Sequence, residues 1–216
     1  MRQSIRLALA AGVAGLAAHA GADAIVTFGF TDLAGNYDHS AGVFTAADDA
    51  DSSGDVTRLE MPIGSANYDV GFSGGTAAAS FSVDVVPISG TMASGSGSFS
   101  IVDANGDTMT GDISGFWIAG ALGIFFNGDL SNVVFTDVSG DGTFDGPDGG
   151  SFSTALSGIP PYDGAVVQLF VPPTGNFFAS SFQVEAVEVS GEIIPTPGVA
   201  GLLGLAGLAA VRRRRA

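Results

Sequence analysis

The sequence predicts an all-β protein, a single antiparallel β-sandwich of the jelly-roll, immunoglobulin-like or a related type, with about nine to eleven strands. Two observations support this. The middle of the chain is rich in Gly, Ser, Thr, Val and Phe, and short alternating apolar runs are separated by turn residues. Almost no stretch of it has the period of a helix. We therefore expect three parts: a signal segment over residues 1–24, the sandwich over 25–192 and a C-terminal segment over 193–216.

The strands are predicted from alternation and from the turns between them. Phe81 and Val83 alternate with polar neighbours, as do Phe99 and Ile101, so each run has one apolar face. Asn105-Gly106 predicts a hairpin with a type I′ turn, and Asn127-Gly128 predicts a second hairpin. The expected strands are 25–31, 42–46, 55–61, 68–72, 77–86, 95–102, 108–118, 132–138, 151–154, 165–171 and 181–193.

The last expected strand carries an irregularity. Its apolar phase changes near Ala186-Val187, which indicates either a bulge or a strand that is buried on both faces.

The N-terminus has the layout of a secretory signal peptide. Arg2 and Arg6 precede the apolar run Leu7–Ala18, which is too short for a permanent membrane span. Two small-x-small sites follow, and we expect cleavage after Ala24, in the site formed by Ala22 and Ala24; cleavage after Ala20 is the alternative. The segment predicts a short helix that engages the Sec translocon and signal peptidase.

The charge of the central part is strongly one-sided. Residues 25–194 hold 21 acidic side chains against the single Arg58, a net charge of about −20. Such a surface repels nucleic acid, because a phosphate binder needs Lys or Arg to displace counterions. It attracts cations. Self-repulsion on this scale destabilises the compact state unless salt or bound cations screen it, which suggests a saline or calcium-containing medium. There is no cysteine, so the exported domain has no disulfide to stabilise it.

The C-terminus combines three features in a fixed order. A Pro-rich motif comes first, then the apolar run Val199–Val211, then four arginines at the end. The apolar run is short for a membrane span, which needs about 20 residues. The motif is Pro195, Thr196, Pro197 and Gly198, and the basic end is Arg212, Arg213, Arg214 and Arg215.

This arrangement closely resembles the PEP-CTERM sorting signal that exosortases process in Gram-negative-type bacteria. The resemblance covers about the last 22 residues, and Thr196 departs from the usual Glu of the motif. It implies export, transient anchoring by a short apolar helix, cleavage near the Pro motif by an exosortase-like membrane protease, and a place at the cell surface or in the extracellular matrix. A plain C-terminal membrane anchor is the alternative.

The stretch at residues 137–148 has the ligand spacing of a calcium loop. Calcium takes six to eight oxygen ligands from a loop that turns at a glycine, here Gly142. Against this, position 12 is Asp in place of Glu, and no amphipathic helix flanks the loop. An Asp/Gly-rich turn is the alternative. The candidate ligands are Asp137, Ser139, Asp141, Thr143, Asp145 and Asp148.

A second, weaker calcium candidate consists of Asp49, Asp51, Ser53 and Glu60. Residues 56–61 alternate as a strand does, and a strand would carry Glu60 away from the loop. Asp103, Asn105 and Asp107 also have ligand-like spacing, but the predicted hairpin accounts for them.

No catalytic set stands out, and we expect no enzyme and no organic cofactor. The leading expectation is an exported structural or adhesive protein, stabilised by calcium. One alternative is a carbohydrate-binding module that binds extracellular polysaccharide through exposed aromatics; another is a secreted glycan hydrolase. Trp117 lies in an apolar strand, so we expect it in the core, while Tyr37, Tyr68 and Tyr162 are further candidates for sugar stacking.

Overall fold

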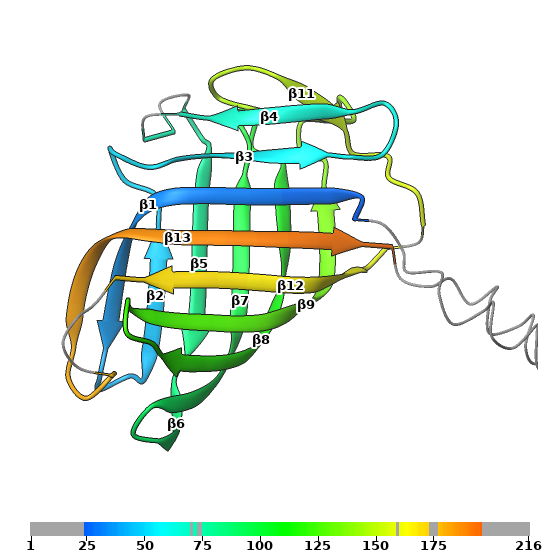
Figure 1. The fold of residues 1–216 in the computed structure, drawn as a ribbon. Coiled ribbons are helices and arrows are strands. Elements are labelled where there is room, and N and C mark those ends of the chain that lie inside the picture. Colours follow the sequence, from blue (N-terminus) through cyan, green and yellow to red (C-terminus); the bar gives the residue numbers. More distant parts are fainter. Residues whose placement is uncertain (1–23, 70, 73–74, 159, 173–176, 196–216) are drawn as a thin grey trace, which may run out of the picture.

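The computed structural model describes residues 24–195 except 70, 73–74, 159 and 173–176. It confirms the all-β antiparallel sandwich (Figure 1), with more strands than expected. Residues 1–23 and 196–216, which hold Ala22 and nearly all of the sorting motif, lie outside the described residues. The strands are β1 (Val26–Asp38), β2 (Val43–Ala47), β3 (Ser53–Arg58), β4 (Gly64–Tyr68), β5 (Ala78–Asp84), β6 (Val86–Ser89), β7 (Met92–Val102), β8 (Thr108–Ala119), β9 (Ile124–Thr136), β10 (Thr143–Asp145), β11 (Ser151–Ser153), β12 (Tyr162–Val171) and β13 (Phe182–Ile194).

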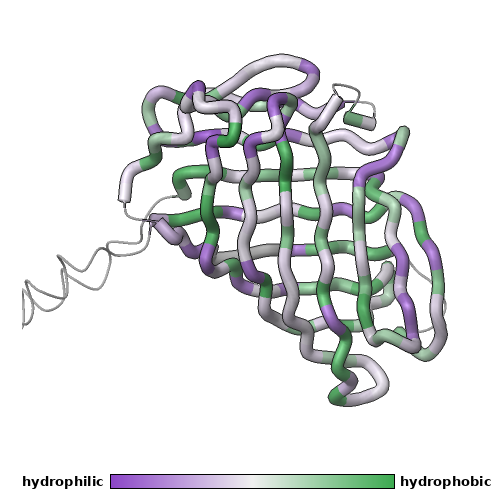
Figure 2. The backbone as a smooth tube through the Cα atoms, turned by 180° about the vertical axis from the view of Figure 1, so that it is seen from behind, coloured by the Kyte–Doolittle hydropathy of each residue, from purple (hydrophilic) through white to green (hydrophobic). Residues whose placement is uncertain are grey.

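One large sheet folds over to form both layers. Its order is β13-β12-β9-β8-β7-β5-β2-β1-β3-β4, β6 pairs with β7, and β13 also pairs with β1. Strands β1, β3, β12 and β13 run along one layer, and β5 and β7 cross behind them (Figure 1). The reverse view shows the same crossing from the other side (Figure 2). Crosswise layers of this kind need strands that bend from one layer into the other.

Three long strands have left-handed residues at irregular points in the sheet. The positive φ values are 58° at Asp32 in β1, 54° at Asn132 in β9 and 61° at Ala186 in β13. The register between β1 and β13 shifts around Leu33 and Val187, which confirms the bulge expected near Ala186-Val187. A bulge bends and twists its strand locally, so these positions let one sheet supply two layers.

The core between the layers is unusually aromatic. Phe28, Phe81 and Phe99 stack at centroid separations of 5.6–6.1 Å. At the other end of the core, Trp117 is fully buried. Its ring lies 4.8 Å from that of Phe126. The apolar alternation read from the sequence therefore corresponds to the inward faces of the strands.

Three local predictions were wrong. Asn127-Gly128 forms no turn and lies inside β9, where an added Cβ on Gly128 would stand 2.4 Å from the Ser114 carbonyl. The β7–β8 hairpin exists, but only Gly106 of its loop has positive φ, which gives a type I turn followed by a left-handed glycine instead of type I′. The strand expected at 68–72 runs over Gly64–Tyr68, and the chain turns at Gly71 (φ 71°) and Phe72 (φ 49°).

A small two-stranded sheet, β10 and β11, covers one end of the sandwich. Phe144 and Phe152 stack at 5.4 Å, and both are buried. The connection between the two strands also bonds to β4, through Asn67 N to Gly149 O and Asp148 N to Asn67 O. This hairpin holds the acidic segment after β9 against the end of the β7–β8 hairpin.

Candidate metal centre

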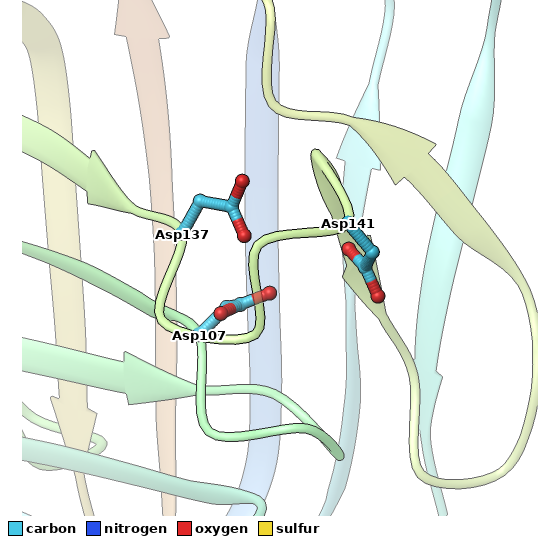
Figure 3. Close-up of side chains that lie close together, drawn as sticks. All are labelled: Asp107, Asp137 and Asp141. Carbon is cyan, nitrogen blue, oxygen red and sulfur yellow. The ribbon is translucent and has the colours of Figure 1, made fainter.

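Two acidic loops meet at the end of the sandwich that β10 and β11 cover. One is the β7–β8 loop with Asp107, and the other follows β9 and carries Asp137 and Asp141. Carboxylate oxygens of these three residues lie within 4.8 Å of one another (Figure 3). Thr108 pairs with Thr136 between β8 and β9, so Asp107 and Asp137 leave the sheet side by side. We call these three carboxylates the acidic junction.

Asp107 is fully buried and serves as an acceptor for the opposite loop. Its Oδ1 accepts hydrogen bonds from the amides of Val138 and Ser139, the latter at 2.7 Å. Its Oδ2 accepts the Ser139 hydroxyl at 2.9 Å. Because a buried carboxylate needs such partners, these bonds fix the position of the second loop.

Asp103 is also fully buried, and it joins the same hairpin loop to β10. Its Oδ1 accepts the amides of Asn105 (2.7 Å) and Asp107 (2.9 Å), and its Oδ2 accepts the amide of Asp145 (2.7 Å). Burial raises the pKa of Asp103, against the opposing effect of these hydrogen bonds, and the neighbouring charge of Asp107 adds to the rise. The hairpin loop and β10 are thereby tied together.

The second loop wraps its backbone around its own carboxylates. Asp137 accepts the amides of Gly140 (2.6 Å) and Gly142 (3.1 Å), and both glycines have positive φ, 79° and 76°. Asp141 Oδ1 accepts both the amide and the hydroxyl of Thr143 at 2.8 Å. These bonds hold the pKa of Asp141 below its ordinary value, so it stays ionised.

The donor set suits a hard cation. Three carboxylates from two loops, with the Ser139 hydroxyl beside them, offer the oxygen ligands that calcium prefers. Within the described chain the only basic residue of the Lys/Arg type is Arg58, which belongs to a different network. The negative charge of the junction is therefore not balanced by a nearby ammonium or guanidinium group.

The structure brings together part of the ligand set expected from the sequence and adds one residue to it. Asp137 and Asp141 belong to the junction, and Ser139 bonds to Asp137 and Asp107. The sequence accounts for Asp107 by a hairpin alone, and the ligand-like spacing of Asp103, Asn105 and Asp107 is the signal that points to its place in the junction.

Two of the other expected ligands have partners outside the junction, and the third contacts its edge. The Thr143 hydroxyl lies 2.8 Å both from Asp141 Oδ1 of the junction and from Asp145 Oδ2. Asp145 Oδ2 also accepts a hydrogen bond from the side-chain amide of Asn105 at 3.0 Å. Asp148 accepts the amide of Asp69 and so supports the turn after β4. Asp145 and Asp148 are thus engaged outside the acidic junction, and the carboxylates that meet there are those of Asp107, Asp137 and Asp141.

The four residues of the second candidate are spread along β3. Asp49 accepts the amide of Asp51 at 3.0 Å in the turn before β3, and Ser53 begins the strand. Glu60 lies beyond the opposite end of β3 and bonds to Ser157. β3 therefore separates Glu60 from the other three residues, as the alternation over residues 56–61 indicated.

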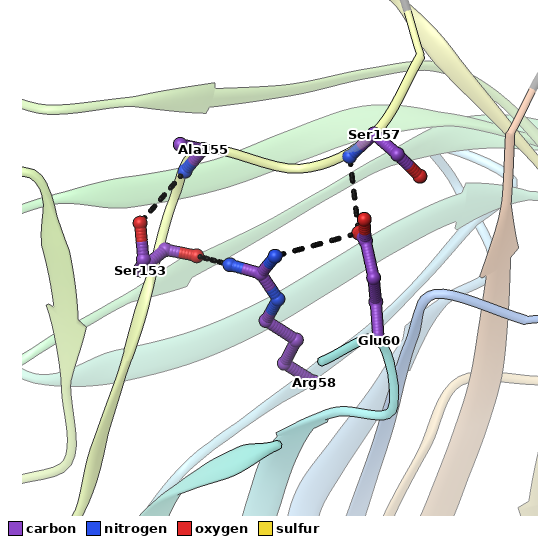
Figure 4. A network of polar contacts seen from close by, with 5 residues as sticks. All are labelled: Arg58, Glu60, Ser153, Ala155 and Ser157. Carbon is purple, nitrogen blue, oxygen red and sulfur yellow. Dashed lines mark hydrogen bonds and ion pairs between the residues drawn. The ribbon is translucent and has the colours of Figure 1, made fainter. Parts of the chain in front are cut away.

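Arg58 and Glu60 form a separate network at that end (Figure 4). Arg58 is 4% exposed, donates to the Ser153 carbonyl at 2.8 Å and lies 3.5 Å from Glu60. Glu60 accepts the Ser157 amide at 3.0 Å, which lowers the pKa of Glu60. The network fastens residues 153–157 to the end of β3.

The aromatic residues considered for sugar stacking are all buried. Trp117 is in the core as expected, and Tyr37, Tyr68 and Tyr162 are at most 5% exposed. Burial raises the pKa of each tyrosine. A stacking platform made of these four residues is therefore absent.

Comparisons with protein-family models, curated proteins and solved structures gave no match to this chain. Among the described residues, none lies in a helix that is long and apolar enough to cross a membrane.

Proposed function

We propose that this protein is an exported structural or adhesive component of the cell surface or extracellular matrix, sorted by an exosortase-like protease and stabilised by calcium. The acidic junction is the observation that carries the structural part of this proposal. It joins two loops at one end of a strongly acidic sandwich, and Asp107 is fully buried there. The terminal sequence patterns support the part that concerns export and sorting.

The role of calcium follows from charge. Three carboxylates within 4.8 Å repel one another, and a divalent cation between them would replace that repulsion with attraction. The cation would bind the folded chain, in which the two loops meet, and so would stabilise the fold by mass action. Calcium at the millimolar level outside cells suits the affinity range of extracellular modules, about 10⁻⁴–10⁻³ M.

Calcium titration of the purified full chain by calorimetry tests the site. We expect saturable binding that the Asp137→Asn variant loses. Asp129→Asn is the matched control, because Asp129 is an exposed aspartate of β9 that lies outside the junction and outside both calcium candidates. Equal affinity in the two variants would remove calcium from the proposal.

The intact mass of the protein recovered from its native cell surface tests export and sorting. We expect a mature chain that begins at Ile25 and ends near Pro195–Gly198. Recovery of the unprocessed 216-residue chain from the cytoplasm would contradict this part of the proposal.

A further inference from the structure

A groove of about 620 Å³ lies over β1, β9, β12 and β13. Leu122, from the loop between β8 and β9, lines it and is 73% exposed. The volume falls within the range of about 300–1,000 Å³ that is typical of small-molecule sites. The groove shares no lining residue with the acidic junction. It can therefore take a ligand of its own.

Two half-buried aromatic rings form the apolar part of the groove. Phe125 and Phe170 are partners across β9 and β12, with ring centroids 5.1 Å apart at an interplanar angle of 43°. An added Cβ on Gly120 would stand 2.6 Å from the Phe125 ring, and one on Gly123 would stand 2.7 Å from the Phe170 ring. Close packing on these glycines holds the rings in place. Such a pair offers the C–H face of a pyranose ring a fixed apolar surface.

The next cross-strand row is polar and uncharged. Asn127, Gln168 and Ser190 are consecutive partners across β9, β12 and β13, and all three are exposed. Gln168 Nε2 donates to Asn127 Oδ1 at 3.2 Å. That bond does not use Asn127 Nδ2 or Gln168 Oε1, so a donor and an acceptor stand beside the rings. Sugar hydroxyls both donate and accept hydrogen bonds, and this row matches that requirement.

The charges around the groove exclude an anionic ligand. Glu188 is the only charged residue that lines it, and Arg58, the only Lys/Arg residue of the described chain, is buried elsewhere. Aromatic rings beside uncharged amides, without a cation, suit a neutral ligand rich in hydroxyls. We propose that this groove binds a segment of a neutral polysaccharide. The inference gives the adhesive role a ligand, and it rests on the proposed location of the protein at the cell surface.

A substitution at Gly29 can fill the groove and so test the proposal. It lies opposite Ser190 at the groove, and the nearest atom to an added Cβ would be the Val189 carbonyl oxygen at 4.0 Å. A side chain here would therefore enter the groove without a clash with the core. Gly29→Val should block the ligand and keep the fold intact, since valine favours strands.

Affinity electrophoresis of the purified full chain in gels with dextran, laminarin or hydroxyethylcellulose measures the binding. Alginate serves as the anionic comparison. We expect retardation by at least one neutral polysaccharide and loss of that retardation in Gly29→Val. The loss of one ring face in Phe170→Leu, or of one hydrogen bond in Gln168→Ala, should weaken binding roughly 2- to 10-fold. Gln183→Ala, at an exposed glutamine of β13 outside the groove, should bind as the unaltered chain does.

Three results would overturn the proposal. The first is that no neutral polysaccharide retards the chain, or that only alginate does. The second is that Gly29→Val, which must keep its melting temperature, binds as well as Gln183→Ala. The third is that sedimentation shows self-association which Gly29→Val abolishes, while no polysaccharide binds; the groove would then be a contact between copies. Calcium titration of the same preparations, and the intact mass of the protein recovered from its native cell surface, separate these failures from failure of the proposed function.

Discussion

Trp117 shows how single side chains hold the two layers together. Its ring contacts Phe44, Phe126 and Phe178, and its Nε1 donates to the Asp84 carbonyl at 2.9 Å. Gly95 lies next to the indole, since an added Cβ there would stand 2.7 Å from Nε1. The side chain therefore fills its site in both shape and hydrogen bonding.

Trp117→Phe should lower the free energy of unfolding by about 1–3 kcal/mol, because it leaves a cavity and removes the donor to Asp84. Urea denaturation measures the change. The neighbouring Phe116 is 51% exposed, and Phe116→Leu should stay within about 0.5 kcal/mol. Equal losses in both variants would show that Trp117 has no special place in the core.

At the scale of elements, the Arg58–Glu60 network ties the segment 153–157 to the end of β3. The hydrogen bond from Ser157 lowers the pKa of Glu60 below its ordinary value in the folded state. A carboxyl group with a lowered folded-state pKa stabilises the fold fully above its ordinary pKa. That contribution disappears as the pH falls through the lower, folded-state value.

Melting curves of the unaltered chain and of Glu60→Gln between pH 6 and pH 3 test this sign. The unaltered chain should be the more stable at pH 6, and the difference should vanish toward pH 3. Glu185→Gln, at an exposed position of β13, is the control and should follow the unaltered chain. A difference that is constant over this range would show that Glu60 does not titrate with folding.

The alternation of apolar and polar residues predicts much of the strand structure, but it does not predict where the strands become irregular. Phe81, Val83, Phe99 and Ile101 are buried as their spacing indicated. Asp32 and Asn132 are of residue types that tolerate positive φ, but so are many others in this chain, and only the register shifts between paired strands place the irregularities at these two. Asp107 could not be assigned to the acidic junction, because only the pairing of β8 with β9 brings it beside Asp137.

At the scale of the whole molecule, net charge opposes the compact state. Residues 25–194 carry 21 acidic side chains and one arginine, and the chain has no disulfide. The free energy gained by burying the aromatic core must therefore exceed the repulsion between the carboxylates. Dissolved salt weakens that repulsion, because its ions screen the charges from one another.

A rise in NaCl from 0.01 to 1 M should raise the melting temperature by at least about 3 °C, since each kcal/mol of relieved repulsion is worth roughly 2–4 °C at this size. KCl should act alike, because screening depends on ionic strength and not on the ion. A melting temperature that does not change with either salt would show that the charges are too well spread to matter.

Thermal melting of the full chain with calcium, with equal magnesium and with excess chelator, at fixed ionic strength, measures directly whether calcium stabilises the fold. Saturating calcium, at about 100 times Kd, should add about 2.7 kcal/mol and raise the melting temperature by roughly 5–10 °C. Magnesium should do much less, and Asp137→Asn should abolish the calcium effect. If calcium and magnesium act alike, the acidic junction is part of a screened surface, and calcium has no structural role in this protein.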